Sequence, residues 1–148
     1  MIVGGGLAAS RTAEQLRRAE HAGEIVIVSG EVHLPYDRPP LSKDVLHKDD
    51  HAFGDVTLKP QEFYDENNIT LRLGSAVTAV DPAARSVTLA DGSSVGYDEL
   101  IIATGLVPRR IPSFPDLAGI HVLRNYDESQ ALRAEAAAAR RAVVIGAG

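Results

Sequence analysis

The chain begins with a short β-branched run, three glycines and then small residues, in the sequence MIVGGGLAAS. Residues 2–3 predict a buried strand, and apolar residues at helical spacing predict a helix that begins near Leu7. In the turn that joins this strand to this helix, Gly4, Gly6 and Ala9 match the pattern G-x-G-x-x-G/A. In this pattern the first glycine permits a tight turn, the second lets a diphosphate approach the backbone, and the third small residue lets helix and strand pack closely. The opening therefore favours a dinucleotide-binding corner over a plain tight turn.

A second strand completes a βαβ unit. Residues 25–28 form a continuous β-branched run, which is typical of a strand buried on both faces in a parallel sheet. Gly23 is expected to end the preceding helix, because glycine tolerates a positive φ. An acid after this strand would hold the ribose hydroxyls of a bound dinucleotide, and Glu31 is the acid available there. A solvated loop carboxylate is the alternative at this position.

The rest of the chain extends this unit into an α/β fold. Prolines in the segment 29–55 predict an irregular loop. A short helix that starts at Pro60 and a strand over 69–73 follow. Residues 76–99 alternate apolar and polar side chains in three runs, which indicates an antiparallel β-meander. We therefore predict a Rossmann-like domain with a parallel sheet plus this small meander.

Two further apolar runs have the pattern of buried strands. Residues 100–104 and residues 142–146 are both rich in β-branched side chains and both end at a glycine. An alanine-rich helix is expected over 127–141, between the two runs.

Composition excludes several classes of function. A formal net charge of −5 provides no basic surface for nucleic acid or for an anionic membrane. No apolar run reaches the roughly 20 residues of a membrane span and no leader is visible, so a cytoplasmic location is expected. Cysteine is absent, which excludes disulfides and a dithiol relay. His47, Asp49, Asp50 and His51 lie close together, but donors in a polar loop are mostly solvated, and we expect no metal site.

The stretch PYDRPPLSK over 35–43 resembles the FAD-dependent ferredoxin reductases that serve oxygenase and cytochrome P450 systems, a branch of the pyridine nucleotide-disulfide oxidoreductase superfamily that includes putidaredoxin reductase. The likeness covers essentially the whole chain, because the glycine turn, the meander with DELIIATG, and the segments PRRIP and VLRNYDESQALR follow in the same order. The resemblance implies FAD as cofactor, NAD(P)H as electron donor and a ferredoxin-type iron–sulfur protein as acceptor. The lack of cysteine favours such an external acceptor over a disulfide.

The resemblance also assigns residues to the cofactor. Lys43 would lie beside the flavin as the candidate catalytic residue, since a positive charge there favours the electron-rich reduced ring. Gly6, Leu7 and Ala8 would form the diphosphate turn, and the backbone at Val77 would meet the adenine. The other implied cofactor positions are Arg38, Ala103, Thr104, Gly105, Arg109 and Arg124. An ordinary surface or strand role is the alternative at Lys43, Val77, Arg109 and Arg124.

One position departs from the family pattern. Counted back from RPPLSK, the family's ribose acid falls on Gly30, which has no carboxylate. Glu31 substitutes for it through a small shift of the loop, or the ribose contact is weakened. The sequence leaves both alternatives open.

A second glycine pattern stands at the end of the chain. VVIGAG over 143–148 resembles the start of an NAD(P)H-binding Rossmann domain, with Gly146 and Gly148 as its first two glycines. We therefore expect residues 1–141 to be the first segment of an FAD-binding domain, and residues 142–148 to be the truncated beginning of the NAD(P)H-binding domain. The expected function is the FAD-binding portion of an NAD(P)H-dependent ferredoxin reductase, inactive by itself. The alternatives are a non-catalytic module that binds FAD or another adenine nucleotide, and an inactive fragment.

Overall fold

The computed structural model describes residues 1–47, 51–115 and 117–146 and divides the chain into two units. Unit 1 consists of Met1–Asp37 and Phe53–Leu106. Unit 2 consists of Arg38–Ala52 and Val107–Gly148.

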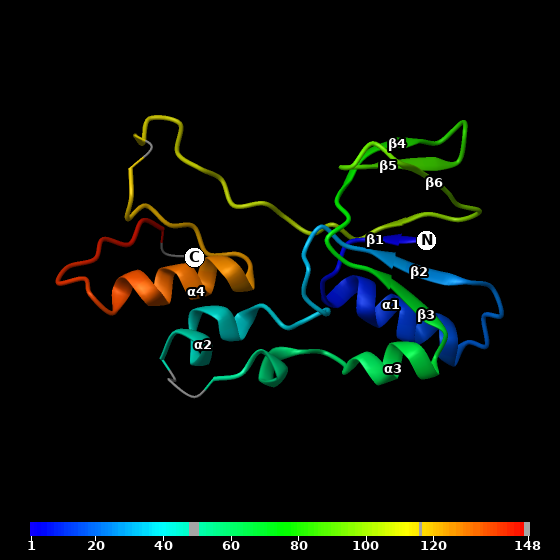
Figure 1. The fold of residues 1–148 in the computed structure, drawn as a ribbon, viewed down its shortest axis with the longest axis horizontal. Coiled ribbons are helices and arrows are strands. Elements are labelled where there is room, and N and C mark those ends of the chain that lie inside the picture. Colours follow the sequence, from blue (N-terminus) through cyan, green and yellow to red (C-terminus); the bar gives the residue numbers. More distant parts are fainter. Residues whose placement is uncertain (48–50, 116, 147–148) are drawn as a thin grey trace. The chain divides into compact units, whose positions relative to one another are not determined.

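A parallel sheet forms the centre of unit 1 (Figure 1). Its strands are β1 (Ile2–Val3), β2 (Ile25–Val28), β3 (Ile69–Arg72) and β7 (Ile101–Ile102), in the order β3-β2-β1-β7. All three pairings are parallel, and Ile2 lies opposite both Ile27 and Ile101. The carboxyl ends of these strands therefore share one edge of the sheet.

Two helices, α1 (Leu7–Arg18) and α3 (Gln61–Glu66), cover one face of this sheet. Ala9 and Ala13 of α1 are fully buried in one cluster with Ile27 and Tyr64. The small side chains of the two alanines let the helix approach the strands closely. Inside this layer, the hydroxyls of Ser10 and Tyr64 lie 2.9 Å apart in a buried hydrogen bond.

The predicted meander covers the other face. Strands β4 (Val77–Asp81), β5 (Ser86–Leu89) and β6 (Ser94–Gly96) pair in an antiparallel manner, as expected. Val87 and Leu89 of β5 are buried with Val3 and Val28, which alternate along their strands with the helix-facing Ile2 and Ile27. Unit 1 thus has three layers, of helices, parallel sheet and meander, and the α/β prediction is confirmed.

The first helix ends earlier than the sequence predicts. It stops at Arg18, with Ala19 as its C-cap, and Gly23 does not have a positive φ. Glu20 occupies the left-handed conformation instead, at φ 59°. The prediction that Gly23 ends the helix was therefore wrong, because a non-glycine residue makes the turn.

The proline-rich segment is more regular than expected. It contains the 3₁₀ helix η1 (Pro39–Ser42), the helix α2 (Asp44–His47) and the 3₁₀ helix η2 (Phe53–Val56). The two prolines at the start of η1 occupy the first helical positions, where proline does not remove a needed hydrogen bond. The prediction of an irregular loop was wrong for these three turns.

Unit 2 is built around α4 (Tyr126–Ala136), which packs on η1 and α2. Asn125 caps the helix in a capping box, because its side chain accepts from the Glu128 N–H while the Glu128 carboxylate accepts from the Asn125 N–H. The buried Ser129 hydroxyl donates to the Leu41 carbonyl at 2.8 Å and ties α4 to η1.

Both runs with the pattern of a buried strand prove to be exposed. Ile101 and Ile102 of β7 are 37% and 67% exposed, since β7 stands at the edge of the sheet. Residues 142–146 have no regular structure, and Val143, Val144 and Ile145 are exposed. A β-branched run is buried only where neighbouring elements cover it, and within the described parts of the chain these neighbours are missing.

No helix in the described segments combines the length and the apolar character needed to cross a membrane.

Candidate functional site

Gly4 closes the corner between β1 and α1. Its φ is +122°, which side chains rarely allow, and its N–H donates to the Val28 carbonyl at 2.8 Å. A Cβ at this position would lie 2.2 Å from the carbonyl oxygen of Ala103, just after β7. Glycine is therefore required at position 4 by its positive φ and by the close approach of the backbone just after β7.

The next two glycines differ in the space around them. A Cβ at Gly5 would lie 2.3 Å from the Ser29 hydroxyl oxygen, so this side of the turn is closed. At Gly6, apart from the glycine and its two chain neighbours, no heavy atom of the described residues lies within 4 Å of the position a Cβ would take. The turn is thus packed at its first two glycines and open at the third, which is the room that an approaching diphosphate needs.

The N-terminus of α1 provides donors beside this opening. Gly6 is the N-cap and has no side chain with which to cap the helix, and the first turn holds no acid. The first helical hydrogen bond runs from the Ser10 N–H to the Gly6 carbonyl at 3.1 Å. The N–H groups of Leu7, Ala8 and Ala9 precede that bond, so they have no partner within the helix. They and the helix dipole favour an anion, and the residues present fit a diphosphate group.

Glu31 lies at the same edge of the sheet, three residues after β2. Its N–H donates to the Ser29 hydroxyl at 3.1 Å, and its carbonyl accepts from the Gly74 N–H at 2.9 Å. Its carboxylate Oε2 accepts from the Tyr36 hydroxyl at 2.5 Å. The half-buried Glu31 carboxylate is therefore held at the carboxyl edge of the sheet.

The segment before β4 runs beside the end of β2. The Ser75 N–H donates to the Ser29 carbonyl at 2.7 Å, and a Cβ at Gly30 would lie 3.2 Å from the Cβ of Ala76. Val77, the next residue, pairs with Leu89 and packs in the cluster between sheet and meander. Its side chain is thus an ordinary strand valine, while its backbone lies near the same edge.

The turn after β7 completes this part of the site. The Ala103 N–H donates to the Val3 carbonyl at 2.7 Å, Thr104 is exposed, and Gly105 has a φ of +70°. Ten of the predicted cofactor residues thus lie in unit 1 at one edge of its sheet: Gly4, Gly6, Leu7, Ala8, Ala9, Glu31, Val77, Ala103, Thr104 and Gly105.

The predicted flavin-side residues belong to unit 2. Arg38 donates from Nη1 to the carbonyl of Arg124 at 2.6 Å, so two of these arginines lie side by side. Lys43 is exposed between η1 and α2, and its carbonyl accepts from the N–H groups of the next turn. Their contacts with a flavin stay predictions.

The remaining predicted positions lie outside regular structure. Arg109 is exposed in the segment between β7 and α4, and Gly146 has a φ of +115°. Gly148 lies outside the described residues, as do Asp49 and Asp50 of the loop that carries several metal-type donors.

Sequence reasoning missed a charged cluster on α1. Glu14 is only 4% exposed, and its carboxylate contacts Arg11 at 2.7 Å, Arg18 at 2.9 Å and Lys59 at 3.2 Å. The hydrogen bond from Arg11, followed by that from Lys59, lowers the pKa of Glu14. The spacing of the two arginines along the helix predicts their pairing with Glu14, but the contact with Lys59 depends on the tertiary fold.

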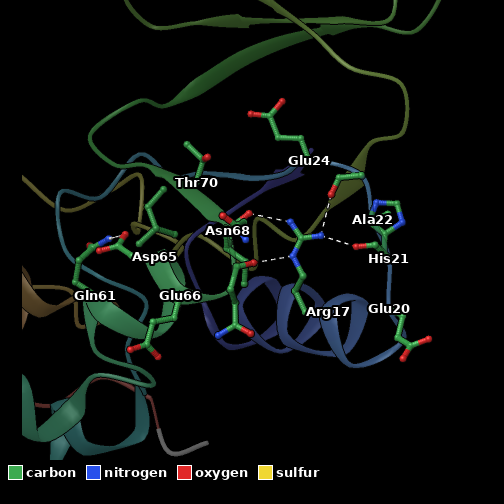
Figure 2. Close-up of a pocket in the computed structure, with 14 residues that line it drawn as sticks. Arg17, Glu20, His21, Ala22, Glu24, Gln61, Asp65, Glu66, Asn68 and Thr70 are labelled. Carbon is green, nitrogen blue, oxygen red and sulfur yellow. Dashed lines mark hydrogen bonds between the residues drawn. The ribbon is translucent and has the colours of Figure 1, made fainter.

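An open pocket of about 1070 Å³ lies at the opposite edge of the same sheet (Figure 2). It is lined by the C-terminal end of α1, the residues before β2 and the turn between α3 and β3. The Arg17 guanidinium crosses it and donates to four backbone carbonyls, those of His21, Gly23, Asn67 and Asn68. This pocket lies at the amino ends of the strands, so it is separate from the glycine turn, and Arg17 links the elements around it.

Burial also shifts the pKa of one tyrosine in unit 1. Desolvation raises the pKa of Tyr64, and its hydrogen bond with Ser10 opposes this shift. The pair lies beneath α1 and supports the helix that carries the glycine turn.

The chain is similar over its whole length to one family of known proteins. A family model described as pyridine nucleotide-disulphide oxidoreductase matches residues 1–148. A ferredoxin–NAD(P)(+) reductase of Sphingomonas sp. is 40% identical over all of this chain and 36% of its own length. The ferredoxin–NAD(+) reductase component of the p-cumate 2,3-dioxygenase system of Pseudomonas putida is also 40% identical, over all of this chain and 37% of its own length.

Solved structures give the same result. The ferredoxin reductase for the CYP199A2 system of Rhodopseudomonas palustris has a TM-score of 0.82 and 34% identity over 90% of this chain and 33% of its own. Putidaredoxin reductase, in its covalent complex with putidaredoxin, has a TM-score of 0.79 and 31% identity over 90% of this chain and 33% of its own. The chain thus spans just over a third of the curated relatives' length. It belongs to the pyridine nucleotide-disulphide oxidoreductase family, in which ferredoxin reductases of oxygenase systems are its relatives.

Proposed function

We propose that this chain is the FAD-binding portion of an NAD(P)H-dependent ferredoxin reductase. The observation that carries the proposal is the open space at Gly6, directly before the uncapped N-terminus of α1. The relatives named as ferredoxin reductases support the type of enzyme. By itself the chain is expected to bind FAD without turning over NADH.

The glycine turn would hold the diphosphate of FAD. The N–H groups of Leu7, Ala8 and Ala9 would donate to its oxygens, and Gly6 would leave room for them. Gly4 would keep the corner tight, because its backbone conformation and its approach to Ala103 leave no space for a side chain.

The adenosine end would lie along the carboxyl edge of the sheet. Glu31 is the acid at the end of β2, and it would accept hydrogen bonds from the ribose hydroxyls. Of the two alternatives for the ribose acid, we propose Glu31 in place of a weakened contact. The backbone at Val77 would meet the adenine, and the turn of Ala103, Thr104 and Gly105 would lie against the cofactor.

The flavin end is assigned by the family resemblance. When bound, FAD would supply the redox chemistry, since a flavin can take a hydride and release single electrons. Lys43 would stabilise negative charge on the reduced flavin by Coulomb attraction. Arg38, Arg109 and Arg124 would contact phosphate or flavin oxygens.

The same proposal includes NAD(P)H as the electron donor and a separate protein as the electron acceptor. Residues 1–141 would be the first segment of the FAD-binding domain, and residues 142–148 would begin an NAD(P)H-binding domain, with Gly146 and Gly148 in its glycine turn. A ferredoxin-type iron–sulfur protein would receive the electrons.

A substitution at Gly6 tests the proposal with two opposite effects. An aspartate there would cap α1 better than glycine does by roughly a few tenths of a kcal/mol, and its charge would add about 0.3–1 kcal/mol beside the helix dipole, which raises the melting temperature. The same carboxylate would fill the open space and repel a diphosphate. We therefore expect Gly6→Asp to lower the affinity for FAD and ADP at least about tenfold, a loss of about 1.4 kcal/mol, in equilibrium dialysis.

Gly6→Asn is the matched control, because it adds a cap of similar size without charge. It should raise the melting temperature slightly, by less than Gly6→Asp, and weaken binding less than Gly6→Asp does. A wild-type chain that binds neither FAD nor ADP would contradict the proposal. Equal FAD affinity in the wild type and Gly6→Asp would place the cofactor elsewhere.

A further inference from the structure

The side chains of Tyr36 and Glu31 form a hydrogen bond at the proposed adenosine end of the site. The Tyr36 hydroxyl donates to Glu31 Oε2 at 2.5 Å. Tyr36 is only 2% exposed, whereas Glu31 is half-buried and accessible from the edge of the sheet. The buried hydroxyl of Tyr36 thus holds the half-buried carboxylate of Glu31 in place.

Tyr36 is itself fixed by the fold around it. It forms an isolated β-bridge with Thr57, and both flanking residues make backbone hydrogen bonds to the same segment, from Asp37 to Val56 and from Leu58 to Pro35. Its ring packs edge-on against Phe53, with the ring centroids 5.6 Å apart. The position of the hydroxyl is therefore set by packing, which is what a residue that orients a ligand group requires.

The backbone of Glu31 is held as well. Its N–H and its carbonyl are both hydrogen-bonded, to the Ser29 hydroxyl and to the Gly74 N–H. With the backbone and one carboxylate oxygen fixed, few rotamers remain open to the side chain. An ionised carboxylate has about four acceptor sites, so a hydrogen bond from Tyr36 is compatible with accepting from further hydroxyls.

The neighbouring position does not accept an acid so readily. A Cβ at Gly30 would lie 3.2 Å from the Cβ of Ala76, so a side chain at Gly30 would require Ala76 to shift. The acid next to it, Glu31, is already in place and accepts a hydrogen bond from the Tyr36 hydroxyl.

We infer that Tyr36 is a positioning residue: it holds the Glu31 carboxylate toward the 2′- and 3′-hydroxyls of an adenosine ribose and makes the site selective for ribonucleotides over deoxyribonucleotides. The inference rests on the proposed function, since it requires an adenine nucleotide at the glycine turn.

The test compares the affinities for ADP and 2′-deoxy-ADP, measured by equilibrium dialysis on the full chain. A hydrogen bond from the 2′-hydroxyl to a charged acceptor predicts that the wild type prefers ADP by about tenfold or more. Tyr36→Phe keeps the ring and removes the hydroxyl. We expect it to reduce this preference several-fold, chiefly through weaker binding of ADP.

Two further variants place the effect at the carboxylate. Glu31→Gln should remove most of the preference, and the double variant should lose little more than Glu31→Gln alone, because the two residues act as one unit. Glu31→Asp keeps the charge but draws the carboxylate one methylene away from the Tyr36 hydroxyl. It should reduce the preference as Tyr36→Phe does, and it serves as the test if Tyr36→Phe does not fold.

Tyr64→Phe is the control for a purely structural effect. It also removes a buried tyrosine hydroxyl, the one bonded to Ser10, and should lower stability while leaving the ratio of the two affinities unchanged. A ratio that is unchanged in Tyr36→Phe, with ADP still bound, overturns this inference alone. A ratio that is unchanged in Glu31→Gln, with ADP still bound, overturns it together with the ribose contact proposed for Glu31. A wild-type chain that binds no ADP overturns the proposed function together with it.

Discussion

At the scale of single residues, two glycines of one turn have different physical roles. Gly4 has no room for a side chain, because its φ is +122° and the Ala103 carbonyl oxygen lies 2.2 Å from the Cβ position. Gly6 has an ordinary φ of −96° and open space around it. Both match the same sequence pattern, yet Gly4 serves the fold and Gly6 is proposed to serve the ligand.

A substitution at Gly4 should therefore act on stability. We expect Gly4→Ala to lower the free energy of unfolding by about 1–3 kcal/mol or more, from backbone strain and the clash with Ala103. Chemical denaturation measures the effect. Gly54→Ala is the matched control, because Gly54 lacks a positive φ and, chain neighbours aside, no atom of the described residues lies within 4 Å of its Cβ position. Equal stability of Gly4→Ala and the wild type would show that the turn between β1 and α1 can shift away from Ala103 at no cost in free energy.

Glu14 should make stability depend on pH. Its pKa is lowered from 4.5 in the folded chain, chiefly by the hydrogen bond from Arg11. A lowered folded-state pKa gives stabilisation that is present above about pH 4.5 and is lost as the pH falls through the folded-state value. Glu14→Gln should therefore melt at a lower temperature than the wild type at pH 7, and this difference should shrink below pH 4.5.

The exposed Glu66 provides the control for Glu14. Glu66→Gln removes a carboxylate from a neighbouring helix of unit 1 and should change the melting temperature little at either pH. A difference in melting temperature between Glu14→Gln and the wild type that stays constant with pH would show that ionisation of the Glu14 carboxylate does not cause the pH dependence.

At the scale of helices and strands, the ends of elements depend on contacts that lie far away in the sequence. Helix α1 ends at Arg18 because Glu20 turns the chain and Arg17 binds the carbonyls around it. Arg17 also reaches the turn between α3 and β3 (Figure 2). A single guanidinium thus joins the ends of three elements, and its planar set of donors suits several carbonyls at once.

Loss of this guanidinium should loosen that edge of the sheet. Arg17→Met keeps most of the length and apolar stem of the side chain and removes all of its donors. We expect a loss of about 1–3 kcal/mol in the free energy of unfolding, and faster amide hydrogen exchange at the start of β3. Gln15→Met, on the exposed side of the same helix, is the control. Equal exchange rates at β3 in both variants would show that Arg17 does not join these elements.

At the scale of the whole molecule, family membership followed from the order of several motifs. No single motif is as specific, since a glycine turn by itself also occurs in plain tight turns. The relatives are ferredoxin reductases, and the chain spans just over a third of their length. The reductase activity of the intact relatives is therefore a proposal for this chain, and its FAD-binding part is tested by the Gly6 variants.

The sequence by itself determined the strand–turn–helix corner, the antiparallel meander and the presence of α4, because local periodicity and turn residues encode these elements. It also selected Gly4, Gly6, Ala9 and Glu31 as candidates. Only the tertiary structure decided which glycine packs against Ala103, that Tyr36 holds Glu31, and that Lys59 joins Glu14. It also showed Ile101 and Ile102 exposed at a sheet edge, since burial depends on neighbours through space, which a local pattern of side chains does not specify.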